Sequence, residues 1–197
     1  MTRRERVIAA INHAQPDICP YTIELTGQAY DRLVEYVGDP GYVDCIGTHI
    51  TAAKYGSKVE DPPGSGYWRD HFGVVWNKKG IDKDIGVVEK YLISEPNLKK
   101  YTFPEVDPAV VRRACEDLFA RAGDTFTVFN MGFSTFERAW TLRGMENLLV
   151  DMVTEPGFVH GLLDAICEFN LGVMNEVLKY PIGGLLFGDD WGQQRGT

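Results

Sequence analysis

Apolar residues recur with helical spacing along several stretches of the chain. One apolar stripe begins after Thr2, a suitable N-cap, and ends before Pro16, so we expect a helix between them. A second stripe lies between Thr26, another N-cap residue, and Gly38, a typical helix stop. The same spacing predicts helices over residues 107–123, 133–156 and 157–181, with the middle one continuous or broken near Gly144.

Other stretches are rich in β-branched and aromatic residues and predict strands. Residues 18–25 form a short β-rich run, and residues 41–56 are ambiguous between strand and helix. Residues 64–80 predict a strand or hairpin, and residues 84–93 a strand that could pair with it as an excursion from the main fold. Two apolar runs, residues 124–132 and 183–190, have the composition of buried strands.

From Asp107 onward the predicted order is helix, strand, helices, strand. Apolar strands that alternate with helices indicate an α/β fold with a parallel sheet covered by helices. In such sheets and barrels, function gathers where strands end and the following loops begin. The two loops in this position are "NMGFSTFERAW" and "GDDWGQQ".

The acids Asp189 and Asp190 follow directly after the last apolar run. Two like charges this close are not both buried and ionised without a partner, which could be a cation, a metal, a proton or a polar substrate. We predict both acids as catalytic candidates. The alternative is that one carboxylate caps the next helix and the other faces water.

Polar and aromatic residues of the same loops, and of the aromatic run before them, are predicted to contact substrate. Glu137 and Trp140 share a helix face by their spacing, although Trp140 could equally be core. Arg138 could pair with Glu137 or bind an anion, but a solvated charge is the preferred interpretation, as is a structural role for His71. The predicted substrate-binding residues are Asn130, Glu137, Trp140, Trp191, Gln193 and Asp70.

Composition narrows the class of protein. The net charge is −8 and no basic cluster is present, which argues against a nucleic-acid partner. No apolar run is long enough to span a bilayer and no secretory signal is evident, so we expect a cytoplasmic protein with no membrane partner. The four cysteines lack metal-ligand spacing, and we expect buried free thiols rather than ligands.

Three segments carry a resemblance to a known family: "RRERVIAAINHAQPDICP", "GFSTFERAWTLRG" and "GGLLFGDDWGQQ". They resemble the uroporphyrinogen decarboxylase superfamily, specifically its divergent branch that includes corrinoid-dependent methyltransferases. The resemblance implies an enzyme built as a single (β/α)8 TIM barrel with its active site at the carboxyl ends of the strands. Such barrels take about 250 residues or more. We therefore expect residues 1–197 to be the N-terminal part of one truncated barrel domain.

The chain departs from true decarboxylases at three places. Their arginine-rich "RQAGR" loop is replaced by "IELTGQAYDRL", Trp140 stands where they have a tyrosine, and Asp189 stands where they have a serine. These departures favour the methyltransferase branch, which moves a methyl group between a corrinoid protein and a thiol or pterin acceptor. A divergent decarboxylase of porphyrin biosynthesis and an inactive fragment remain as alternatives.

The resemblance also sets expectations about cofactors and partners. It implies a small-molecule substrate and a partner protein that carries the corrinoid. Zinc would be held by histidine and cysteine residues of the family's second half, so we assign no metal ligand and expect no cofactor within residues 1–197. A half barrel leaves a parallel edge strand unpaired, and a homo-oligomer would be one way to cover it.

Overall fold

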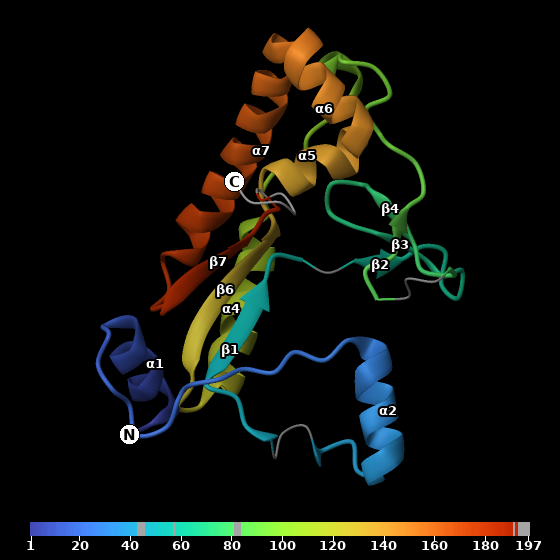
Figure 1. The fold of residues 1–197 in the computed structure, drawn as a ribbon. Coiled ribbons are helices and arrows are strands. Elements are labelled where there is room, and N and C mark those ends of the chain that lie inside the picture. Colours follow the sequence, from blue (N-terminus) through green and yellow to red (C-terminus); the bar gives the residue numbers. More distant parts are fainter. Residues whose placement is uncertain (43–45, 57, 81–83, 191, 193–197) are drawn as a thin grey trace.

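A computed structural model describes residues 1–42, 46–56, 58–80, 84–190 and 192 (Figure 1). The fold is mixed α/β, with one parallel and one antiparallel sheet. The described elements, in chain order, are α1 (Arg3–Ile11), α2 (Gly27–Val37), β1 (Ile50–Lys54), β2 (Val59–Glu60), β3 (Tyr67–Arg69), β4 (Val75–Asn77), β5 (Val87–Val88), the 3-10 helix η1 (Leu98–Lys100), α4 (Pro108–Ala122), β6 (Phe126–Phe133), α5 (Phe136–Arg143), α6 (Met145–Thr154), α7 (Pro156–Val177) and β7 (Gly184–Gly188).

The parallel sheet has the strand order β1-β6-β7. If the strands of the antiparallel sheet are set aside, each strand of the parallel sheet lies beside the strand that precedes it in sequence. Helix α4 packs on β1 and β6, and α7 packs alongside α4, so both crossover helices belong to one layer (Figure 1). This winding confirms the predicted parallel sheet with helical cover. No complete barrel is present among the described residues.

One contiguous core holds the two sheets and helices α4, α5, α6 and α7 together. Phe129 of the central strand β6 is fully buried, as are Cys115 of α4 and Ile166 of α7. Trp76 of the antiparallel sheet belongs to the same core. The excursion predicted from residues 64–80 and 84–93 is confirmed, since β3, β4 and β5 pair antiparallel, although β5 is shorter than the predicted strand. Strand β2, which lies before the predicted range, completes this sheet, and the sheet packs onto the main body.

The first helix is anchored at the amino-terminal ends of the strands. A capping box between Thr2 and Glu5 starts α1, which confirms the predicted cap. Arg3 pairs with Asp124 at 2.5 Å, just before β6. The helix ends at Ile11 rather than near Pro16, because His13 takes a positive φ of 55° and breaks the helical path.

Helix α2 projects from the body (Figure 1) and none of its residues is buried. Its cap at Thr26 and its stop at Gly38, with φ of 77°, are both as predicted. The strand predicted over residues 18–25 is wrong. This segment is irregular and largely exposed, because no strand of either sheet pairs with it. No helix in the described part of the chain is long and apolar enough to cross a membrane.

Candidate functional site

The carboxyl ends of the three parallel strands meet at one edge of the sheet. Lys54 of β1, Asn130 of β6 and Leu186 of β7 are in register across the sheet, and all three line one cavity. A bulge displaces the register between Asn130 and Phe133, where Gly132 has a φ of 62°. The three strands thus place Lys54, Asn130 and Leu186 at the carboxyl edge of the sheet, where the sequence predicted a functional site.

We call this space the lysine cavity, and its volume is about 720 Å³. It lies between the strand ends, the start of α5 and the antiparallel sheet. Four cationic side chains line it, against three acids, in a chain whose net charge is −8. The cations are Lys54, Lys58, Lys78 and Arg138, and the acids are Asp70, Asp84 and Glu137. This local positive excess suits an anionic ligand.

Asp70 and Arg138 form a buried ion pair in the wall of the lysine cavity. Arg138 donates from Nη1 to Asp70 Oδ2 at 2.7 Å, and both side chains are about 5% exposed. Asp70 also accepts the backbone N–H groups of Phe72 and Val74 and the indole N–H of Trp76. The preferred interpretation of Arg138 as a solvated charge is therefore wrong, because Asp70 and the ring of Phe72 at 4.4 Å enclose its guanidinium.

His71 lies beside this ion pair and also lines the lysine cavity. Its ring stacks on Phe169 with centroids 5.4 Å apart and meets Tyr55 edge-on at 5.1 Å. Desolvation by these rings, with a further contribution from Arg138, lowers the pKa of His71. Because the pKa of His71 is lowered, its imidazole is neutral at neutral pH. The side chain is still exposed on one side.

Glu137 faces the lysine cavity from the first turn of α5. Desolvation raises the pKa of Glu137, and the nearby carboxylates of Asp190 and Asp189 raise it further. Asn130 lies opposite on β6, where its Oδ1 accepts the N–H of Gly132 at 2.7 Å and supports the bulge. Of the predicted substrate-binding residues, Asp70, Asn130 and Glu137 are thus brought together at this cavity.

Trp140 lies one turn further along α5 and does not line the lysine cavity. Its ring packs against the core, 6.3 Å from that of Phe133, and its indole N–H is buried without a hydrogen-bond partner among the described residues. Trp191 and Gln193, the other predicted substrate contacts, lie outside the described residues.

Asp189 has a defined structural role at the start of α5. Its carboxylate accepts the backbone N–H groups of Thr135, Phe136 and Glu137 at 2.7–3.1 Å and the Thr135 hydroxyl at 2.6 Å. Thr135 itself makes no side-chain cap, so Asp189 caps α5 from the neighbouring strand. Asp190 is exposed. One acid thus caps a helix and the other is exposed, but the capped helix is α5, which precedes Asp189 in the chain, and not the next helix as the alternative predicted. The catalytic role of both acids stays a prediction.

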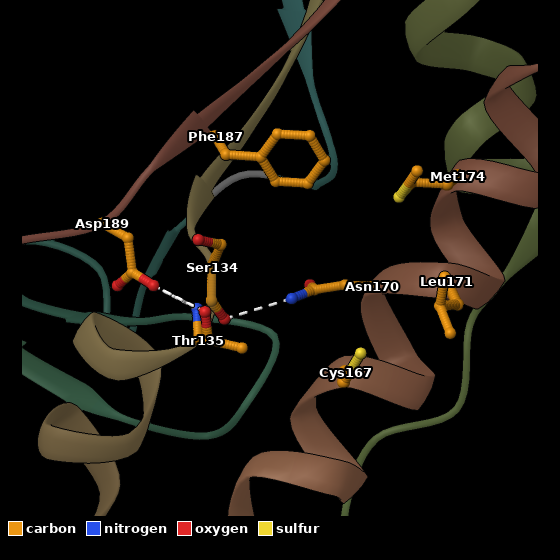
Figure 2. A pocket seen from close by; sticks show the side chains of 8 residues that line it. All are labelled: Ser134, Thr135, Cys167, Asn170, Leu171, Met174, Phe187 and Asp189. Carbon is orange, nitrogen blue, oxygen red and sulfur yellow. Dashed lines mark hydrogen bonds between the residues drawn. The ribbon is translucent and has the colours of Figure 1, made fainter. Parts of the chain in front are cut away.

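A second, smaller cavity of about 300 Å³ lies on the other side of Asp189, against α7 (Figure 2). We call it the Asp189 cavity. Its wall is mostly apolar, with Phe187, Leu171 and Met174 around it, and Asn170 donates to the Ser134 carbonyl at 3.1 Å. Cys167 also lines it and is exposed.

The cysteines do not follow the predicted pattern of buried thiols. Cys115 is buried, but Cys19 and Cys167 are exposed, and Cys45 lies outside the described residues. Cys167 is exposed because it sits on the side of α7 that faces the Asp189 cavity rather than the core. Within the described ranges, no group of three or more His, Cys, Asp or Glu side chains could hold a metal ion.

Sequence reasoning missed the three lysines of the lysine cavity. Lys54 ends β1, whereas Lys58 and Lys78 come from the antiparallel sheet region, and only the fold brings them to one space. Desolvation lowers the pKa of Lys58 to about 8, with repulsion by Lys78 as the next largest cause. A lysine at the carboxyl end of a strand was the one signal in the sequence that could have pointed to Lys54.

Comparisons of the chain with protein-family models, with curated proteins and with solved structures found no match in any of the three. The geometry described above therefore carries the functional conclusions, alongside the resemblance of the three segments.

Proposed function

We propose that this chain is part of an enzyme of the uroporphyrinogen decarboxylase type, and that its lysine cavity binds a small anionic substrate. The observation that carries the proposal is the convergence of Lys54, Lys58 and Lys78 at the carboxyl ends of parallel strands. In parallel α/β folds this edge is where ligands bind, because the loops that follow the strands are free to form a site. Lysine ammonium groups at such an edge favour carboxylate or phosphate groups.

The strand order supports the barrel part of the proposal. In a (β/α)8 barrel each new strand is added next to the previous one, with every crossover helix in the outer layer. The order β1-β6-β7 follows this rule over three strands, and α4 and α7 lie in one layer. The antiparallel sheet is then an insertion after the first strand that covers the carboxyl edge.

The proposed reaction is transfer of a methyl group between a partner corrinoid protein and a thiol or pterin acceptor. A corrinoid held by the partner would supply the methyl group, and the lysines of this chain would orient an acceptor through its anionic groups. Glu137, which lines the cavity and whose pKa is raised, would exchange a proton with the bound acceptor. Because the described residues offer no zinc ligand set, we derive no step through zinc.

One observation favours the decarboxylase as a second candidate. The departures from the "RQAGR" loop suggested that substrate carboxylates would lack counter-charges. The lysine cavity supplies such charges from other positions, since Lys54, Lys58 and Lys78 all line it. A substrate with several carboxylates is therefore compatible with this edge of the sheet.

A product assay separates the two candidates. The chain is incubated with methylcobalamin and either 2-mercaptoethanesulfonate or tetrahydrofolate, and methylated acceptor is measured by mass spectrometry. We expect methylated product that decreases when Lys54 and Lys78 are replaced by glutamine. Formation of coproporphyrinogen from uroporphyrinogen, without methyl transfer, would favour the decarboxylase. Absence of both products, together with no binding of malonate, would contradict the proposed function.

A further inference from the structure

Lys58 is held in the lysine cavity by two defined contacts. Its ammonium lies 3.7 Å from the centroid of the Trp76 ring and donates to the Ile85 carbonyl at 3.0 Å. Trp76 is only 1% exposed, so its ring is a fixed platform. These contacts restrict the Lys58 side chain, which is itself half-buried, to one place in the wall of the cavity.

Three neighbouring cations and one acid act on the charge of Lys58. Lys78, Arg138 and Lys54 disfavour the charged ammonium, whereas Asp70, the Trp76 ring and the Ile85 carbonyl favour it. Asp70 is paired with Arg138 at 2.7 Å, and the Arg138 guanidinium opposes the effect of Asp70 on Lys58. Desolvation is the largest cause of the lowered pKa of Lys58, about 8. Near neutral pH a larger fraction of Lys58 than of an ordinary lysine is therefore the free amine.

A lysine that is desolvated and surrounded by other cations is the arrangement that makes an amine a nucleophile toward carbonyl groups. Lys54 and Lys78 line the same cavity and are suited to bind a carboxylate of the same ligand. We propose that Lys58 forms a Schiff base with a small carbonyl compound that carries a carboxylate, of the 2-oxo or 3-oxo acid class. The proposal rests on the proposed anion site but adds a covalent step to it.

The chemistry of this step is balanced within the site. The Lys58 nitrogen bonds to the carbonyl carbon, and the carbonyl oxygen leaves as water after taking up two protons that the amine gives up. His71, which is neutral and lines the same cavity, is suited to carry one of these protons. No oxidant or reductant is needed. An external hydride donor is required only to trap the product in the experiment.

The test is reductive trapping with glyoxylate and sodium cyanoborohydride at pH 7.5, followed by peptide mapping. Hydride addition to the imine leaves a stable carboxymethyl group on the lysine. We expect Lys58 to be labelled at least about 10-fold faster than the exposed Lys99 of η1. Its rate should rise with pH and level off above about pH 8, in the range where the Lys58 ammonium loses its proton. Labelling of Lys58 no faster than Lys99 would overturn the proposal.

Two variants and one competitor sharpen the result. Lys58→Gln should abolish the fast adduct, whereas Lys99→Gln should keep it, and mapping of the wild-type chain needs neither variant to fold. Malonate, an anion without a carbonyl group, should slow labelling of Lys58 but not of Lys99. If malonate binds and Lys58 is not labelled, the Schiff-base proposal fails while the anion site stands. If Lys58 is labelled fast and malonate does not bind, the anion site fails while the reactive amine stands.

Discussion

The two sides of the carboxyl edge use their charged groups in different ways. On the side of the Asp189 cavity, the acid is bound by three backbone N–H groups of α5 and the surrounding wall is mostly apolar. On the other side, Lys54 and Lys78 line a cavity more than twice as large and have no ion pair among the described residues. Asp189, which stands out in the sequence, thus stabilises the fold, and the lysines that do not stand out are available to a ligand.

The largest expected effect concerns the buried pair beneath the lysine cavity. Asp70→Ala removes the partner of Arg138 and the acceptor for two backbone N–H groups and one indole. We expect the free energy of unfolding in urea to fall by about 3–5 kcal/mol, since a buried charge is left unpaired. Lys54→Ala, in the same cavity but exposed, should change stability by less than about 0.5 kcal/mol. Equal losses of stability in the two variants would contradict the claim that Asp70 stabilises the fold whereas Lys54 is available to a ligand.

A smaller effect is expected on the other side of the edge. Asp189→Ala removes the cap of α5 and should lower the free energy of unfolding by about 1–2 kcal/mol. Asp190→Ala is the matched control, because Asp190 is the adjacent acid and is exposed. Its effect should lie within about 0.5 kcal/mol of zero. A larger loss for Asp190 than for Asp189 would show that the cap does not act as described.

The lysines should affect binding rather than stability. The double change Lys54→Gln and Lys78→Gln should weaken malonate binding by about 10-fold, or ~1.4 kcal/mol, in calorimetry at low salt. The control is Lys90→Gln with Lys99→Gln, which alters net charge equally at exposed sites outside the cavity. If the control weakens binding as much, the effect belongs to the charge of the whole chain and not to the cavity.

The smallest effect concerns pH. Because the pKa of Glu137 is raised, its carboxyl takes up a proton earlier than an ordinary glutamate as pH falls, which removes a negative charge from the lysine cavity. Sulfate, which does not titrate in this range, should bind about twofold to threefold more tightly at pH 5 than at pH 7. Glu137→Gln should bind at the higher affinity throughout and flatten the curve. An unchanged pH dependence in that variant would exclude Glu137 as its cause.

Local patterns predicted local structure well. The caps at Thr2 and Thr26 and the stop at Gly38 are confirmed, because each depends on residues adjacent in sequence. Of the two alternatives for residues 133–156, the structure has the break at Gly144. The hairpin in residues 64–80 is confirmed for the same reason. The carboxyl edge was also expected, since strand order follows from alternating helices and strands.

Contacts between distant residues could not be predicted in this way. Arg138 looked solvated because its partner, Asp70, is 68 positions away in the chain. Asp189 caps a helix that starts more than 50 positions earlier. The run at residues 18–25 has β-rich composition but no neighbouring strand, and composition alone does not supply one.

The central claim is that ligands bind on the lysine side of the carboxyl edge. It is tested most directly by titrating isotope-labelled protein with malonate and following backbone and lysine side-chain resonances by NMR. We predict saturable shifts at Lys54, Lys58 and Lys78, with little change at Cys167 and Met174 in the Asp189 cavity. Shifts confined to the Asp189 cavity, or spread evenly over exposed lysines, would contradict the account.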